Sequence, residues 1–265
     1  MLPPYLPPAI AAELRNARAS LTAVDQLEGR WGAISLNEAY AVQHHDAVTA
    51  AGSWPAAAAA LDGFKLGFTS RAKMAQMNLS TPIYGLLPRG SRIAAGATLS
   101  RAAYIQPRVE PELAVVVGRS IPLDMHPDEA WLRLDHACAA MELLDSRYRD
   151  YKFSVTDVIA DNTSAAGYLL GSERLPLSRD LGNLGVLFYK NGTLIEAAST
   201  AAALEHPKHA FAALLTMLRD HGLTELTEGA VILTGGLTAA HAMAPGDHAR
   251  IILEGLGAVD LHFAS

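Results

Sequence analysis

The feature that most constrains the fold is a change of pattern near residue 63. Before it, residues 8 to about 25 are helix formers, and "SLNEAYAVQHH" has Ser35 three residues before Glu38, the capping-box spacing that begins a second helix. After it come short apolar segments of strand length, bounded by glycines. The pattern predicts an α+β fold, in which helices over residues 1–62 lead into a β-rich body over residues 63–265, together one compact unit with a mixed, barrel-like sheet.

The strand candidates are short and well separated. "GFKLGFTS" (63–70) alternates, so Lys65 lies on the face opposite its apolar neighbours, and "RVEPELAVVVGR", "CAAMELLDSR", "GAVILTGGL", "HARIILEGLG" and "AVDLHFA" are further candidates. Asn191-Gly192 lies between two apolar runs and predicts a hairpin. "PDEAWLRLDHA" is typical of a short helix, and "EHPKHAFAALLTMLRDHG" of an amphipathic helix that ends at Gly222.

Composition excludes several classes of function. The 265 residues are 50% hydrophobic and carry a formal net charge of -6, with no basic block that could follow a phosphate backbone, so a nucleic-acid partner is not expected. The single cysteine, Cys138, allows neither an internal disulfide framework nor a multi-cysteine zinc site. Prolines interrupt the N-terminal apolar segment and no run is long enough to span a membrane, so a cytoplasmic protein with no membrane association is expected.

The chemistry is expected at the segment "RVEPEL". Glu110 and Glu112 lie at i and i+2 of a strand and therefore share a face, while Pro111 predicts a sheet edge or a bulge. Two close carboxylates repel each other, and a cation relieves the repulsion; oxygen donors alone favour Mg²⁺ or Mn²⁺. Glu142, in the apolar context "AAMELLD", is the natural third ligand. The alternative is a solvated strand edge whose charges prevent aggregation.

Three further features could contribute to a site. Lys65 could supply a fixed positive charge beside an anionic substrate, or could be an ordinary edge lysine. The segment 145–164 carries acids, an arginine and an asparagine beside small residues, which is typical of a loop lining a site or of capped turns. "LTGGLT" (233–238) could hold a carboxylate on its backbone N–H groups, or could be a plain turn. No G-x-S-x-G, P-loop or G-x-G-x-x-G motif is present.

Taken together, six stretches resemble one family over nearly the whole chain. "GFKLGFTSRAKMAQM", "RVEPELAVVVGR", "MELLDSRYRDYKF", "DVIADNTSAAGYLLG", "EHPKHAFAALL" and "VILTGGLTAAHAMAPGDHARIILEGLGAVDLHF" are similar, in order, to the hydratase/decarboxylase branch of the fumarylacetoacetate hydrolase superfamily. The resemblance implies a mixed-sheet body, here the catalytic domain, around a divalent metal, usually Mg²⁺. Glu110, Glu112 and Glu142 match the family's metal ligands, and Lys65 matches its active-site lysine.

The resemblance also implies a reaction. It favours decarboxylation of a 2-oxo-enedioate such as 2-oxo-3-hexenedioate (4-oxalocrotonate) in the meta-cleavage catabolism of aromatic compounds, through a metal-stabilised dienolate. The candidate substrate contacts are Arg147, Asn162, Ser164, Thr234 and Gly235. The expected partners are the small 2-oxo acid, further copies of the chain in a homo-oligomer, and a homologous hydratase or decarboxylase.

Alternatives remain at "NLSTPIYG" (78–85), where the hydratases of this branch have acidic residues and this chain has Ser80 and Ile83. That difference places decarboxylation first and hydration of 2-hydroxypenta-2,4-dienoate (the 2-oxopent-4-enoate hydratase reaction) second. A C–C hydrolase of acylpyruvates would need a base for water, for which no clear candidate exists. A non-catalytic partner of a related enzyme is the fourth reading.

Overall fold

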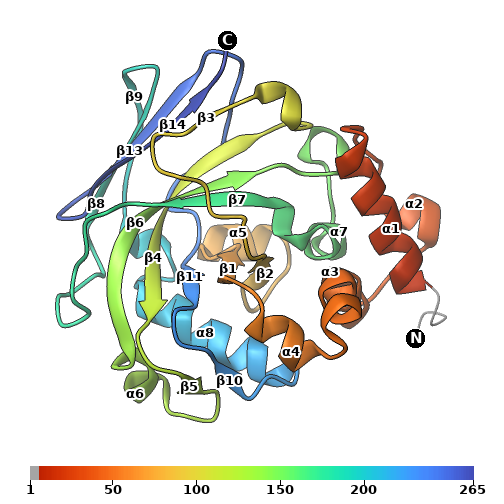
Figure 1. Ribbon diagram of the computed structural model, residues 1–265, viewed down its shortest axis with the longest axis horizontal. Coiled ribbons are helices and arrows are strands. Elements are labelled where there is room, and N and C mark those ends of the chain that lie inside the picture. Colours follow the sequence, from red (N-terminus) through yellow and green to blue (C-terminus); the bar gives the residue numbers. More distant parts are fainter. Residues whose placement is uncertain (1–5) are drawn as a thin grey trace.

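A computed structural model describes residues 6–265 (Figure 1). The helices are α1 Leu6–Ala19, α2 Glu28–Trp31, α3 Leu36–Ala51, α4 Trp54–Ala59, α5 Arg71–Gln76, α6 Pro127–Trp131, α7 Val155–Ala160 and α8 Pro207–Asp220, with short 3-10 turns at Arg101–Ala103, Arg149–Tyr151, Asn162–Ser164 and Thr200–Ala202. The strands are β1 Gly63–Gly67, β2 Ile83–Leu87, β3 Thr98–Leu99, β4 Arg108–Val117, β5 Ile121–Pro122, β6 Leu134–Leu144, β7 Ala165–Leu170, β8 Gly185–Lys190, β9 Thr193–Ser199, β10 Glu225–Leu226, β11 Val231–Leu233, β12 His241–Ala242, β13 His248–Leu253 and β14 Gly257–Phe263.

The strands form two main sheets. A curled seven-stranded sheet has the order β2-β1-β11-β4-β6-β7, with β12 also paired to β4, and a five-stranded sheet has the order β3-β14-β13-β8-β9. The pairs β1·β11 and β14·β3 are parallel and the others in these sheets are antiparallel, so both sheets are mixed. Helices α1–α4 lie to one side of the curled sheet and the five-stranded sheet to the other (Figure 1). The α+β prediction is confirmed.

One apolar core joins the helical lead-in to the β-rich body. A single cluster of buried hydrophobic residues runs from Ile10 in α1 to Phe263 in β14, and includes residues of α3, both main sheets and α8. The capping box that begins α3 is present as expected, since the Ser35 hydroxyl accepts from the Glu38 N–H and the Glu38 side chain accepts from the Ser35 N–H. Burial of this shared face stabilises the helices far more than their intrinsic propensity does.

Local structure departs from the simplest sequence pattern at three places. The first helix ends at Ala19 and not near residue 25, because Leu21 takes a left-handed conformation and Val24 then pairs with Tyr148 as an isolated bridge. The alanine-rich stretch after α3 contains the short helix α4, which Ser53 caps. The segment 145–164, expected as a loop lining a site or as capped turns, also contains the helix α7, which begins at a second capping box between Ser154 and Asp157.

Pro111 does not lie at a sheet edge or in a bulge. It pairs with Met141 of β6, and β4 is an inner strand between β6 and β11; the register shift of this pair lies at Val116/Val117 instead. The other edge of β4 explains why proline is tolerated there. The Pro111 carbonyl accepts from the N–H of Leu237, in the loop between β11 and β12, so its N–H position faces a loop and not a continuous strand.

Candidate metal centre

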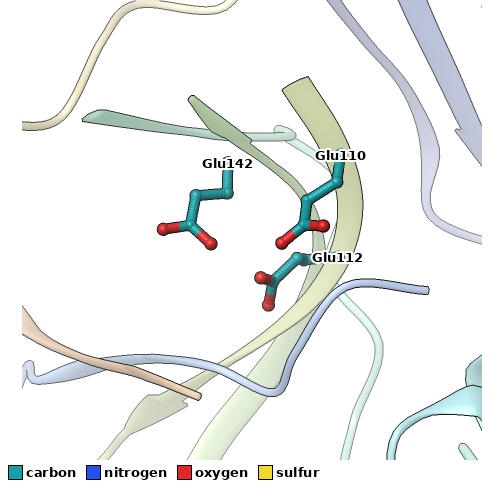
Figure 2. A group of neighbouring side chains, drawn as sticks. All are labelled: Glu110, Glu112 and Glu142. Atoms are coloured by element: carbon teal, nitrogen blue, oxygen red, sulfur yellow. The ribbon is translucent and has the colours of Figure 1, made fainter. Parts of the chain in front are cut away.

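Three carboxylates meet where β4 and β6 pair. Glu110 lies directly opposite Glu142 in the antiparallel register, and Glu112 is two residues further along β4 on the same face. Each offers one carboxylate oxygen, and these oxygens all lie within 4.8 Å of one another. Figure 2 shows the three carboxylates turned toward a common point. Their exposures are 8%, 0% and 0%, so water does not solvate them as it would a surface acidic cluster.

The cluster has too little positive charge around it. Lys65 of β1, which is 2% exposed, forms an ion pair with Glu142 (Nζ to Oε2 3.0 Å) and donates to the Thr163 carbonyl at 3.2 Å. The backbone N–H of Gly235 donates to Glu112 Oε2 at 2.7 Å. Oε1 of Glu112 and Oε1 of Glu142 are buried without a hydrogen-bond partner among residues 6–265. One lysine therefore faces three carboxylates.

The pKa values of these groups reflect this imbalance. Burial raises the pKa of Glu142 to about 7, although Lys65 opposes the rise, and burial together with the other two carboxylates raises the pKa of Glu112 well above its ordinary value. Burial alone would lower the pKa of Lys65, but the three carboxylates more than offset it and raise that pKa. Lys65 is therefore held protonated, while the carboxylates lack sufficient counter-charge. A divalent cation would supply it.

The donor set suits a hard cation. All three groups are carboxylates, with no sulfur or imidazole among them, which favours Mg²⁺ or Mn²⁺ over zinc. The two glycines after β11 allow the backbone to approach the cluster closely. Gly235 has φ +112°, and a Cβ atom on Gly236 would lie 2.5 Å from Glu110 Oε2. The residues present therefore fit a divalent metal.

A cavity of about 280 Å³ opens beside the cluster. Its polar lining includes both signs of charge: Lys65, Lys73, Arg108, Glu110, Thr163 and Ser164. Its apolar lining is Phe68, Ile83, Leu144, Phe153 and Val158, with Gly236, Ala239 and Ala240 of the loop after β11. Cations, a carboxylate and an apolar wall in one cavity are typical of a site for a small organic anion.

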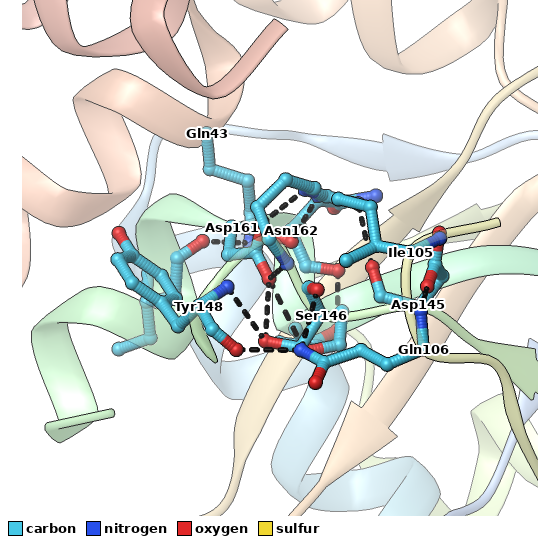
Figure 3. A network of polar contacts seen from close by, with 12 residues as sticks. Gln43, Ile105, Gln106, Asp145, Ser146, Tyr148, Asp161 and Asn162 are labelled. Carbon is cyan, nitrogen blue, oxygen red and sulfur yellow. Dashed lines mark hydrogen bonds and ion pairs between the residues drawn. The ribbon is translucent and has the colours of Figure 1, made fainter. Parts of the chain in front are cut away.

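A polar network supports one wall of this cavity (Figure 3). Asp161 accepts hydrogen bonds from the hydroxyls of Ser146 and Ser164 and forms an ion pair with Arg147. This fixes the turn 162–164, in which all three residues have positive φ, a conformation that non-glycine residues adopt at a cost. The turn presents the Thr163 carbonyl to Lys65 and Ser164 to the cavity.

The structure brings some of the expected residues together and separates others. Lys65, Glu110, Glu112 and Glu142 form the cluster, and Ser164 lines the cavity. Four expected substrate contacts have other partners: the Asn162 amide bonds to the backbone of Leu86, the Thr234 hydroxyl donates to the Leu113 carbonyl, Arg147 pairs with Asp161, and Gly235 donates to Glu112. None of these four lines the cavity.

Sequence reasoning missed three residues of the cavity. Arg108 lies two residues before Glu110 on β4, so the alternation that paired Glu110 with Glu112 also places it on their face. Lys73 of α5 and Tyr151 line the cavity as well, and the arginine lies over the Tyr151 ring, with 3.9 Å from Cζ to the ring centroid. No local pattern indicated Tyr151, because its position depends on the fold of the segment after β6.

A family comparison agrees with this geometry: residues 39–263 match the family described as Fumarylacetoacetate (FAA) hydrolase C-terminal. The chain belongs to this family. A 4-oxalocrotonate decarboxylase of Pseudomonas sp is 40% identical over 197 residues, which are 74% of this chain and 76% of that protein. Among fumarylacetoacetate hydrolase relatives aligned over more of the chain, 2-keto-4-pentenoate hydratase 1 of Dechloromonas aromatica (strain RCB) is 30% identical over 258 residues, 97% of this chain and 96% of that protein.

A solved structure in the family extends the likeness to the fold. The 4-oxalocrotonate decarboxylase of Pseudomonas putida G7, complexed with magnesium and adipate, superposes with a TM-score of 0.90 at 32% identity, covering 99% of both chains. The resemblance inferred from six sequence motifs is thereby confirmed. In the described part of this chain, no helix has the length and hydrophobicity that a membrane span requires.

Proposed function

We propose that this protein is a Mg²⁺-dependent lyase that decarboxylates a 2-oxo-enedioate, with 2-oxo-3-hexenedioate (4-oxalocrotonate) as substrate, in the catabolism of aromatic compounds. The observation that carries the proposal is the convergence of three buried, undercompensated carboxylates on a cavity with cationic and apolar walls. Relatives named 4-oxalocrotonate decarboxylase at 36–40% identity support the choice of reaction.

Glu110, Glu112 and Glu142 would hold the metal, and Mn²⁺ could replace Mg²⁺ at an all-oxygen donor set. When bound, the metal supplies Lewis-acid stabilisation of the negative charge that develops on the 2-oxo oxygen. The Gly235 N–H holds Glu112 in place from the opposite side. The unpartnered carboxylate oxygens are the remaining donors.

Lys65 supplies a permanent positive charge beside the 2-oxo end of the substrate. Its position is fixed at both ends, since the backbone of β1 pairs with β2 and β11 and the Nζ atom contacts Glu142 and Thr163. Because its pKa is raised, it remains protonated at neutral pH and stabilises electron density on the 2-oxo oxygen electrostatically. Because this charge is already in place before the reaction, the side chain does not have to move to stabilise the negative charge that develops.

The rest of the cavity favours loss of carbon dioxide. The carbon–carbon bond to the distal carboxylate breaks, CO₂ leaves, and the electron pair moves through the conjugated chain toward the 2-oxo oxygen. Leu144, Phe153 and Val158 present apolar surface to the cavity. An apolar wall suits a charged carboxylate that becomes neutral CO₂ and limits access of water to the electron-rich carbon chain.

The experiment is to incubate the purified protein with Mg²⁺ and 2-oxo-3-hexenedioate and to measure CO₂ release. Wild-type protein is expected to turn over only with added metal, and Glu110→Gln to lose at least about 100-fold in kcat/KM with an unchanged far-UV circular dichroism spectrum. Full activity and full metal affinity in Glu110→Gln would show that the metal is held elsewhere.

A hydratase is the second candidate, because hydratase relatives align with nearly the whole chain. Supplying 2-hydroxypenta-2,4-dienoate and measuring 4-hydroxy-2-oxo acid formation separates the two reactions. Ile83 lines the cavity and Ser80 is exposed in the turn after α5, so neither position gives the carboxylate expected of a hydratase. The decarboxylase proposal therefore predicts that CO₂ release exceeds hydration in kcat/KM.

The remaining proposals concern the location of the protein, its organisation into one unit and its association with other chains. We infer a cytoplasmic enzyme whose N-terminal part, residues 1–62, and catalytic part, residues 63–265, act as one unit, since a shared core joins the described residues of both. We also infer a homo-oligomer that associates with a homologous hydratase or decarboxylase, on the basis of the family resemblance. Light scattering of the purified protein, alone and mixed with such a hydratase, tests both forms of association.

A further inference from the structure

Arg108 is held at the cavity by its backbone, which pairs with strands on both sides, and by its side chain, which contacts Tyr151. Its backbone is paired on both sides, with Leu144 of β6 and with Ala242 of β12. Its guanidinium lies over the ring of Tyr151, and the Tyr151 hydroxyl accepts from the Ser146 N–H at 3.4 Å. Tyr151 and the preceding Asp150 both have φ +57°, which is strained backbone for residues other than glycine. The fold therefore fixes this guanidinium over a flat aromatic surface.

Arg108 nevertheless lacks a protein acceptor. Two other arginines near this corner are fully engaged: Arg147 pairs with Asp161, and Arg101 donates to three backbone carbonyls. Among residues 6–265 the Arg108 guanidinium has neither an ion pair nor a side-chain hydrogen bond. Stacking occupies a face of the guanidinium and leaves the N–H groups at its edge, which are suited to bidentate binding of a carboxylate.

The strand register sets the distance between Arg108 and the acidic cluster. Along β4 and β6, one cross-strand pair is Glu110 with Glu142, and the next pair on the same face is Arg108 with Leu144. Two residues of strand separate these pairs by about 6.6–6.8 Å. The two carboxyl carbons of an extended six-carbon diacid are about 6 Å apart, from five carbon–carbon bonds of about 1.5 Å. The backbone positions of Arg108 and of Glu110, which line the same cavity, are thus separated by about the length of a six-carbon dicarboxylate.

We propose that Arg108 is a specificity-determining residue, which binds the second carboxylate of a dicarboxylate whose first end lies at the Glu110–Glu112–Glu142 cluster. The inference rests on the proposed function and adds to it the group that selects a dicarboxylate over a monocarboxylate. The two other cations of the cavity are less suitable. Lys65 is paired with Glu142, and the Lys73 side chain is exposed on the short helix α5.

The proposal predicts a kinetic signature. The ion pair between Arg108 and the distal carboxylate is complete in the bound substrate and weakens as that carboxylate becomes neutral CO₂. Arg108 therefore contributes more to substrate binding than to the chemical step. Its loss should raise KM for the dicarboxylate and leave kcat much less affected.

The test compares adipate with its monomethyl ester as ligands of the Mg²⁺-loaded protein, by calorimetric titration. The ester keeps the six-carbon chain of adipate and removes one charge, at the cost of one added methyl group. Wild-type protein is expected to bind adipate about 10- to 100-fold more tightly than the ester, Arg108→Gln to lose that preference, and Arg108→Lys to retain part of it. Two control variants each remove one positive charge: Lys73→Gln from the cavity and Arg119→Gln from the surface. Both variants should still bind adipate more tightly than the ester.

The outcomes are separable from those of the proposed function. A preference for adipate that survives in Arg108→Gln, or that falls equally in Lys73→Gln, overturns the inference even if the wild type releases CO₂. An Arg108-dependent preference in a protein that does not decarboxylate overturns the proposed function and supports the inference. With active protein, KM for 2-oxo-3-hexenedioate should rise at least about 10-fold in Arg108→Gln, with a smaller change in kcat.

Discussion

At the scale of single residues, the centre stores an electrostatic cost that a metal would relieve. Glu112 is fully buried and close to two other carboxylates, and its Oε2 accepts from the Gly235 N–H. Such a group destabilises the metal-free protein whenever it ionises. The same residue would be a strong ligand once a divalent cation is present. Its contribution to stability should therefore change sign with metal.

This gives the first prediction. Glu112→Gln should raise the thermal stability of the metal-free protein, because it removes a buried charge while an amide oxygen can still accept from Gly235. It should also abolish most of the stabilisation that Mg²⁺ gives to the wild type. Differential scanning calorimetry with and without Mg²⁺ measures both effects. A metal-free variant less stable than the wild type, with an unchanged response to Mg²⁺, would contradict the prediction.

A second prediction concerns the approach of the loop after β11 to the carboxylates. A methyl group at residue 236 would lie 2.5 Å from Glu110 Oε2, so Gly236→Ala must displace that carboxylate. We expect Mg²⁺ affinity to fall at least about 10-fold with a stability change under about 2 kcal/mol. Gly185→Ala is the matched control, because its added methyl group meets only Glu254 at 3.6 Å. Equal Mg²⁺ affinity in both variants would refute the steric argument.

At the scale of elements, α3, α4, β2 and the end of α8 meet at a cluster of aromatic and histidine side chains. His44 of α3 stacks on Trp54 at 3.7 Å, and its Nε2 lies 3.1 Å from the Tyr84 hydroxyl, which in turn lies 2.6 Å from Nδ1 of His221. Burial and the neighbouring His221 lower the pKa of His44 to about 3. The junction between the helical lead-in and the sheet therefore contains a histidine held neutral.

The third prediction follows from the sign of that shift. The unfolded chain binds a proton at His44 below about pH 6.5 and the folded protein does so only near pH 3, so stability falls as the pH is lowered through that window. Protonation linked to this residue should cost about 2 kcal/mol at pH 5 relative to pH 7.5. Chemical denaturation of wild type and His44→Gln at both pH values tests this, since the variant should lose less stability on acidification. Parallel losses would mean that His44 does not titrate as inferred.

At the scale of the whole molecule, the centre joins distant parts of the chain. Its ligands come from β4 and β6, its lysine from β1 and its backbone donor from the loop after β11. A bound ion would therefore join β4 and β6 directly, while β1 and that loop contact its ligands. Binding to the folded state alone stabilises by mass action, about 2.7 kcal/mol at 100 times Kd. This effect should extend to global unfolding, because these strands form the centre of the sheet.

The fourth prediction is that Mg²⁺ at about 100 times its Kd raises the melting temperature by about 5–10 °C, and that a chelator reverses the rise. Ca²⁺ and Mn²⁺ serve as comparisons in the same calorimetric scan. The triple variant with glutamine at positions 110, 112 and 142 should show no shift. A shift of equal size in that variant would show that the ion acts at another site.

Much of the fold and of the centre could be predicted from local pattern. The strand containing Glu110 and Glu112, the Asn191-Gly192 hairpin and the helix ending near Gly222 all lie where periodicity and turn chemistry indicated. Local pattern gave the wrong prediction for Pro111, which was expected at a sheet edge or a bulge. The neighbour of its missing N–H is the loop between β11 and β12, which lies more than 120 residues later in the chain. Local pattern left open the roles of Asn162 and Arg147, because their polar groups could equally bind substrate or brace a turn.

The sequence alone determined the α+β class, the shared face of Glu110 and Glu112, and the family, because alternation, capping and ordered motifs are properties of short stretches of chain. Only the tertiary structure decided that Glu142 lies opposite Glu110, that Lys65 is the single nearby cation of the cluster among residues 6–265, and that Arg108 faces the cavity over Tyr151. Those relations depend on strand register and on long-range packing. They arise only when β4, β6 and β1 meet, since no residue's local propensity specifies its partner across a sheet.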